Sequence, residues 1–317
     1  MKNTFCLLFV ISFAIISNVN AQNEKQKFWA LNSCNLLLSK SGSLIPSTVN
    51  VAYSVRKLDC KYSGPCMKVR IGNNGAEANV AFYGTVVSPN SIVTVTKTGS
   101  GFTSGNTYTF STFYAGAKVY VITWYDQSGN GNNATNTSNP PLIVNSGTLI
   151  TENNYPSIEF SGAHTTINLI LTSAINLTSG SLFGVYNATS SATTCGIAQY
   201  LTSYSYNVNT YNNTGKLGAT QYGTTDAASA ISYNTTLDIT CWSKLNTNPT
   251  IEINTRLASS TAYNPANVNI PIAVSQIYGN ALAATTLHIS ELIVTDYATS
   301  NQRAAVFTNQ RSFFNTP

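Results

Sequence analysis

Short alternating segments separated by turn residues recur along most of the chain, and this pattern restricts the fold more than any other feature. Residues 67–71 (MKVRI) alternate apolar and polar, which is the period of a half-buried strand. Similar segments follow at 118–125, 157–160, 167–171, 181–186, 237–245, 250–257, 270–279 and 287–297. Gly, Asn, Pro and Ser clusters separate them. The pattern predicts an all-β antiparallel sandwich.

The composition supports strands and excludes several functional classes. Only 9% of the residues are charged and 43% are hydrophobic, whereas an average soluble domain is about 25% charged. Charge-driven disorder is excluded, and a helical bundle is disfavoured because strong helix formers do not dominate. The 16 basic residues form no cluster and face 11 acids, so no nucleic-acid partner is expected. Low charge with many Asn, Ser and Thr residues suits an extracellular β-protein that meets neutral ligands.

The two ends of the chain differ from the strand-rich part. Residues 1–21 are interpreted as a secretory signal, because Lys2 precedes an apolar run at 5–16 that is too short to span a bilayer. A buried N-terminal helix is the alternative. Secretion, or a location at the cell surface or in the periplasm, is therefore expected, with no membrane span.

Residues 22–50 are interpreted as a lead-in segment with one short helix around 35–38, and residues 51–317 as one sandwich domain. A short C-terminal helix is predicted after Thr299, because apolar side chains recur at roughly helical spacing from Val306 to Phe314. No internal repeat of fixed period is found. The Asn and Thr richness nevertheless keeps a β-solenoid open as an alternative.

The cysteines suggest disulfides, because export permits them. Cys60 and Cys66 flank a segment that contains a Gly-Pro turn, so a bridge between these two is predicted. Cys195 with Cys241 is a second, weaker pairing, and Cys34 is the candidate for a free thiol. The chain has only two histidines and no Cys/His spacing typical of a zinc site. Neither a metal nor a cofactor is expected.

The most distinctive segment is WYDQSGNGNN at residues 124–133, where a strand ends in two aromatics and enters a tight turn. Gly129 and Gly131 permit positive φ, and Asn130 tolerates it. Asp126 can accept backbone N–H bonds across the turn. Three interpretations stay open: a rigid structural turn, a calcium site that would need more oxygen ligands than Asp126 supplies, and direct contact with a ligand.

Together with other segments, this motif resembles the catalytic domain of the α-L-arabinofuranosidase B family. The resemblance is carried, in the family's order, by residues 53–58, 62–65, 69–70, 124–133, 140–143 and 156–162. It is close over roughly 35–165 and loose over 230–317. It implies a concanavalin A-like jelly roll with a short C-terminal helix, a fold that many laminin-G-like domains share. The string YDQSGNGN is specific for this superfamily but not for an activity.

The resemblance also implies where catalysis would occur. Retaining glycosidases need two carboxylates about 5–5.5 Å apart. The family nucleophile is a Glu followed by two Asn, and the matching segment holds Tyr211 before Asn212 and Asn213. The family acid/base Asp corresponds to Asn280. Either the alignment slips here or the family's hydrolysis is lost, since Asn cannot shuttle a proton and a neutral Tyr is a poor nucleophile.

The catalytic residues are therefore unknown, and a set of ligand-binding residues is predicted instead. This set comprises Asp126, Asn130, Tyr211, Asn212, Asn213 and Asn280. Glu291 and Asp296 are nearby alternative carboxylates, but their position on a strand favours a structural or surface role. His288 is interpreted as a solvent-facing residue of the same strand.

Three functions are compatible with these residues. The first is a secreted glycoside hydrolase that acts on α-L-arabinofuranosyl side chains, as the resemblance implies. The second is a non-catalytic glycan-binding or adhesion module on the same fold, and the third is a surface structural protein. An arabinose-containing polysaccharide, or another neutral glycan, is the expected partner, because rings stack on aromatics while polar side chains orient hydroxyls.

Overall fold

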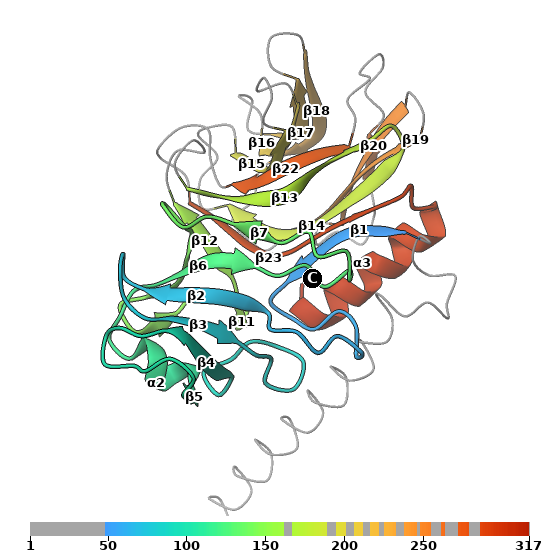
Figure 1. Ribbon diagram of the computed structural model, residues 1–317. Coiled ribbons are helices and arrows are strands. Elements are labelled where there is room, and N and C mark those ends of the chain that lie inside the picture. The colour runs from blue at the N-terminus through green and yellow to red at the C-terminus, as the bar shows by residue number, and fades with distance from the viewer. Residues whose placement is uncertain are drawn as a thin grey trace, which may run out of the picture.

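The structure is a computed structural model, and strands dominate it (Figure 1). It describes residues 48–161, 167–188, 195–200, 206–211, 216–221, 225–232, 238–245, 248–254, 261–263, 272–278 and 286–316. The predicted signal at 1–21 and the predicted helix around 35–38 lie outside the described residues. The first described strand begins at Val49, close to the predicted start of the sandwich domain.

Each strand predicted from the sequence is present in the structure, and several extend beyond their predicted ends. The first half of the chain contains β1 (Val49–Ser54), β2 (Met67–Ile71), β3 (Glu77–Val80), β4 (Ile92–Lys97), β5 (Thr107–Thr109), β6 (Val119–Trp124), β7 (Ala134–Thr135), β8 (Leu142–Asn145), β9 (Thr148–Leu149), β10 (Thr151–Glu152), β11 (Tyr155–Pro156) and β12 (Ile158–Ser161).

The second half continues with β13 (Asn168–Leu177), β14 (Gly180–Ala188), β15 (Cys195–Tyr200), β16 (Tyr206–Tyr211), β17 (Lys216–Gln221), β18 (Thr225–Ser232), β19 (Asp238–Leu245), β20 (Asn248–Asn254), β21 (Thr261–Tyr263), β22 (Ile272–Tyr278) and β23 (Thr286–Thr295). Strands β15–β18 were not predicted, and neither were β1, β3–β5, β7–β11 and β21. In β15, β17 and β18 small residues such as Gly and Ala interrupt the alternating pattern.

Strand β6 is the branch point of the sheet, since it pairs with β2, β7 and β8. The first branch runs β2–β3–β4–β5. The second runs β8–β12–β23–β14–β19–β20–β21, with β1 also on β23. The third runs β7–β13–β22–β15–β16–β17–β18. These pairings are all antiparallel, as an all-β sandwich predicts.

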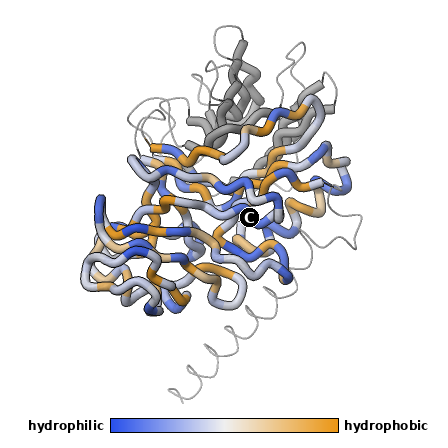
Figure 2. The backbone as a smooth tube through the Cα atoms, in the orientation of Figure 1, coloured by the Kyte–Doolittle hydropathy of each residue, from blue (hydrophilic) through white to orange (hydrophobic). Residues whose placement is uncertain are grey.

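The core lies between the sheet faces, and hydrophobic and hydrophilic residues alternate along its strands (Figure 2). Trp124, Tyr53, Phe160 and Phe183 are fully buried. Trp124 comes from the distinctive turn segment and packs on Tyr53 of β1, with ring centroids 5.8 Å apart. Burial of aromatics of this size is a main source of stability in such a core.

The predicted C-terminal helix is α3 (Ser300–Phe314), which follows β23 (Figure 1). Thr299 caps it, and Gln302 completes a capping box, a feature that contributes about 1 kcal/mol. The helix buries Val306, Phe307, Phe313 and Phe314, as the spacing predicts. One further short helix, α2 (Phe110–Tyr114), was not predicted.

The predicted Cys60–Cys66 disulfide is wrong. Cys66 is a free thiol, fully buried, and its Sγ lies 3.2 Å from the backbone oxygen of Ser54. Burial raises the pKa of this thiol. Cys60 lies on the exposed loop that precedes β2. The sequence spacing allowed a bridge, but the start of β2 turns Cys66 toward the core and away from that loop.

Candidate functional site

The 124–133 turn is organised by the carboxylate of Asp126, which is only 4% exposed. Its Oδ1 accepts hydrogen bonds from the backbone N–H groups of Ala52 and Ser128, each at 2.9 Å. Its Oδ2 accepts from the Ser128 hydroxyl at 2.7 Å and from the Asn132 N–H at 3.1 Å. All four bonds are internal, which supports the structural interpretation of the motif.

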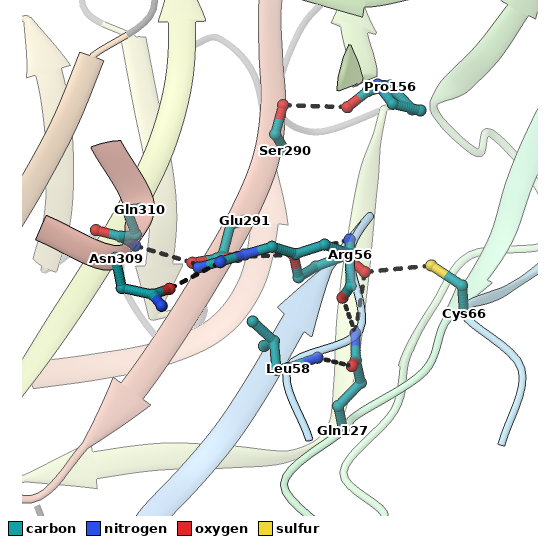
Figure 3. Close-up of polar contacts among 10 residues, drawn as sticks. Arg56, Leu58, Cys66, Gln127, Pro156, Ser290, Glu291, Asn309 and Gln310 are labelled. Atoms are coloured by element: carbon teal, nitrogen blue, oxygen red, sulfur yellow. Dashed lines mark hydrogen bonds and ion pairs between the residues drawn. The ribbon is translucent and has the colours of Figure 1, made fainter. Parts of the chain in front are cut away.

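The neighbouring side chains of the turn tie it to β1 (Figure 3). Gln127 donates to the backbone oxygens of Ser54 and Arg56, each at 3.0 Å, and accepts from the Leu58 N–H at 2.9 Å. Asn130 donates to two backbone oxygens at the start of β1, at 2.8 and 3.0 Å. The turn therefore positions β1. Ligand binding by Asp126 and Asn130 stays a prediction.

A second polar network is buried between β1, β23 and α3 (Figure 3). Arg56 forms two hydrogen bonds to Glu291, from Nε at 2.7 Å and from Nη2 at 3.0 Å, and both side chains are at most 1% exposed. Asn309 accepts from Arg56 at 2.7 Å, and Gln310 donates to Glu291 at 3.0 Å. Glu291 is thus occupied in fastening α3 to the sheet, as its predicted structural role requires.

Two further glutamates converge on His288, and this cluster is partly exposed. Glu159 and His288 are register partners on β12 and β23, and His288 is the register partner of Asn187 on β14. Glu159 lies 3.3 Å from Nε2 of His288. Glu152, from β10, contacts Nδ1 and accepts from the Asn187 amide at 2.9 Å. The side chains are 14–20% exposed.

The cluster is charged at neutral pH. Burial alone would lower the pKa of His288, but its hydrogen bonds to Glu152 and Glu159 raise it to about 9. Burial would raise the pKa of Glu152, whereas the bonds from His288 and Asn187 lower it. The bond from His288 also lowers the pKa of Glu159. The imidazolium occupies the space between the two carboxylates, so they cannot flank a glycosidic bond there.

His288 was expected to face solvent, and this expectation is wrong. The His288 side chain is only 14% exposed, because Glu152 of β10 contacts one ring nitrogen and Glu159 of β12 contacts the other. Glu152 and Glu159 were not predicted as partners. The sequence carried no signal for this contact, because the partners are 136 and 129 positions away.

The positions that the family resemblance singles out lie in the third branch. Asn168, at the start of β13, pairs with Tyr278, at the end of β22. Tyr211, at the end of β16, pairs with Cys195, at the start of β15, and β15 pairs with β22. Four strand ends therefore lie on the same side of this branch: the starts of β13 and β15 and the ends of β16 and β22. We call this row of strand ends the β16–β22 edge.

The predicted nucleophile position, Tyr211, is at the β16–β22 edge, and β22 ends there two positions before Asn280. Asn212, Asn213 and Asn280 lie outside the described residues. The sequence around this edge contains no acid at all: residues 160–225 and 253–290 include neither Asp nor Glu. These two stretches contain all four strands.

Among the described residues, no group of three or more His, Cys, Asp and Glu side chains is placed to hold a metal ion. Neither helix in the described part of the chain is long and apolar enough to cross a membrane.

Comparisons with known proteins find similar folds among solved structures. No family profile and no curated protein matches the chain. Its structure is similar to a GH54 α-L-arabinofuranosidase variant soaked with 4-nitrophenyl α-L-arabinofuranoside, at 16% identity and a TM-score of 0.55. It is also similar to an arabinofuranosidase complexed with arabinofuranosyl-α-1,2-xylobiose, at 13% identity and a TM-score of 0.57.

These alignments cover 89% and 90% of this chain, but only 64% and 65% of the two arabinofuranosidase chains. The chain thus spans less than two thirds of their length. At this level of identity the likeness shows the fold. It confirms the predicted resemblance to the α-L-arabinofuranosidase B catalytic domain at that level.

Proposed function

We propose that the protein is an exported, carbohydrate-active protein that binds α-L-arabinofuranosyl glycans at the β16–β22 edge without hydrolysing them by the family mechanism. The observation that carries the proposal is the absence of any acid in residues 160–225 and 253–290, within a fold similar to arabinofuranosidases. The fold supports the sugar class. The missing acids support binding without turnover.

The chemical reason is the requirement for two carboxylates. Double displacement at the anomeric carbon needs one carboxylate as nucleophile and a second as acid and then base. The family resemblance assigns the nucleophile position to Tyr211, at the end of β16, and the acid/base position to Asn280. Such side chains can still stack on a sugar ring and bond its hydroxyls. These two side chains therefore support binding of a sugar more readily than its hydrolysis.

Four other carboxylates of the described residues have internal partners. Asp126 holds the turn, and Glu291 pairs with Arg56. Glu152 and Glu159 share His288. Each has internal partners that it would have to leave before it could act on a substrate. This supports a binding function over a relocated active site.

The test measures binding and turnover on the same protein. Binding to debranched and branched arabinan and to arabinoxylan is measured by calorimetry, and hydrolysis is measured with 4-nitrophenyl α-L-arabinofuranoside. Binding with no nitrophenol release above the buffer rate is the expected result. Release at an enzymatic rate would contradict the loss of hydrolysis, and absence of both binding and release would contradict the carbohydrate function.

A matched pair of variants locates the site. Tyr211→Ala is expected to weaken arabinan binding about tenfold, or about 1.4 kcal/mol, because it removes an aromatic from the proposed edge. Tyr83→Ala is the control, since Tyr83 is 51% exposed in the loop between β3 and β4 of the first branch. Equal weakening by both variants would contradict a site at the β16–β22 edge.

Export is the part of the proposal that rests on the N-terminal sequence alone. N-terminal sequencing of the protein recovered outside the cytoplasm is expected to begin at Gln22. A chain that retains residues 1–21 and stays in the cytoplasm would contradict it.

A further inference from the structure

The hairpin of β10 and β11 is a two-stranded unit separate from the large sheet, and it contacts both α3 and strands of that sheet. On one side it contacts the end of α3. The Tyr155 ring lies 4.9 Å from that of Phe313 and 5.6 Å from that of Phe314. The Asn153 amide donates to the backbone oxygens of Phe314 and Asn315, at 3.4 and 3.3 Å.

On its other side the hairpin is attached to the sheet. Glu152 contacts His288 of β23 and accepts from Asn187 of β14. The backbone oxygen of Pro156 accepts from the Ser290 hydroxyl at 3.2 Å. The hairpin therefore extends from the sheet to the last turn of α3. Its contact with a group that titrates is the one between Glu152 and His288.

The protonation of His288 decides whether this contact can hold. Both ring nitrogens face carboxylate oxygens, Nδ1 toward Glu152 and Nε2 toward Glu159. A doubly protonated ring donates to both carboxylates, but a neutral ring has one N–H and turns a lone pair toward one of them. Glu159 is fixed by strand pairing on β12, in register with His288. Glu152 belongs to the separate β10–β11 hairpin, so the contact between His288 and Glu152 is the one that breaks when the ring is neutral.

We propose that the β10–β11 hairpin is a protonation-controlled latch, closed by the His288 imidazolium, that holds the C-terminal end of α3 against the sandwich. Opening the latch releases Glu152 from the sheet and, with it, the contacts of Asn153 and Tyr155 to the helix end. The proposal does not depend on the glycan-binding function.

The charged groups around the latch determine the pH range in which it is closed. His288 faces Glu152 and Glu159, Lys118 acts on Glu159, and Arg56 acts on Tyr155 of the hairpin. The pKa of His288 is about 9 in the closed state and about 6.5 when the ring is free. Closure is therefore complete below about pH 6.5 and weakens as the pH rises toward 9. Protonation of Glu152 below its lowered pKa weakens it again in acid.

Hydrogen exchange resolved by mass spectrometry tests the latch on the full protein, with rates corrected for the intrinsic effect of pH. In the wild type, protection of residues 151–156 and of the last turn of α3 is expected to fall at least tenfold between pH 7 and pH 9.5. His288→Gln is expected to show low protection in these segments at both pH values, because a neutral amide cannot close the latch.

Glu77→Gln serves as the matched control, since Glu77 is a partly exposed glutamate in an ion pair with Lys68 on the first branch. Its latch protection is expected to follow the wild type. The amides of β2 and β6 report on global unfolding and are expected to stay protected. The proposal is overturned by a wild type with no pH dependence, by the same dependence in His288→Gln, or by simultaneous loss in β2 and β6.

Discussion

The second and third branches of the sheet use polar residues in opposite ways. In the second branch and the elements packed on it, ionised side chains fasten one element to another: Arg56 with Glu291 joins β1, β23 and α3, and His288 joins β23 to the β10–β11 hairpin. In the third branch, strands β13, β22, β15 and β16 contain no acid. Ion pairs in the second branch therefore join one element to another, whereas the four strands at the proposed sugar edge contain no acid.

The largest effect is expected from breaking the buried ion pair. Glu291→Gln leaves the Arg56 guanidinium, which is 1% exposed, without its counter-charge. Removal of one partner from such a pair costs about 3–5 kcal/mol of folding free energy. Urea unfolding followed by circular dichroism measures it. Glu77→Gln is the control, for which a loss of unfolding free energy under about 1 kcal/mol is expected. Equal losses in the two variants would show that the buried ion pair contributes no more to stability than the surface pair.

The turn of the distinctive motif is expected to give the next largest effect. Asp126→Asn replaces an oxygen that accepts from Ser128 and Asn132 with an amide that can only donate. The expected loss is about 2 kcal/mol of unfolding free energy with unchanged affinity for arabinan. The opposite outcome, reduced affinity with unchanged stability, would assign Asp126 to ligand binding and remove the structural interpretation.

The His288 cluster is expected to add a smaller, pH-dependent contribution to global stability. Because the pKa of His288 is raised to about 9, its contribution is complete below about pH 6.5 and is lost as the pH rises through 9. The pKa values of Glu152 and Glu159 are lowered, so their contributions are present above about pH 4.5 and are lost in acid.

His288→Gln measures this contribution directly. The difference in unfolding free energy between wild type and variant is expected to be about 1–2 kcal/mol near pH 6 and to vanish by pH 10. A difference that stays constant from pH 6 to pH 10 would show that the ring contributes by packing and not by its charge.

The smallest effect is expected from adding charge to the neutral edge. The double variant Tyr211→Glu with Asn280→Asp restores the two residue types that retaining hydrolysis needs. Release of nitrophenol from 4-nitrophenyl α-L-arabinofuranoside is expected to rise above the wild-type background in the double variant but in neither single variant. If the double variant and both single variants release nitrophenol only at the background rate, these two side chains do not account for the loss of activity.

Sequence periodicity predicted the strands that have a hydrophobic and a polar face, such as β2, β6 and β23, because alternation follows directly from burial of one face. It also predicted α3, from the capping residue Thr299 and the spacing of its apolar side chains. It missed β15, β17 and β18, where small residues interrupt the alternation, and it also missed β4 and β16, whose segments do alternate. It could not decide among the interpretations of Asp126, because these depend on which backbone N–H groups the fold brings to the carboxylate.

The sequence by itself determined the strand-rich architecture, the position of the Gly-Asn turn and the absence of acids in the stretches around the predicted catalytic positions, because these follow from local residue types. The tertiary structure decided which charged residues meet. Arg56 and Glu291 are 235 positions apart, and Glu152 and His288 are 136 apart. It also turned Cys66 into the core and away from Cys60. Such contacts depend on strand order and register, which local periodicity does not specify.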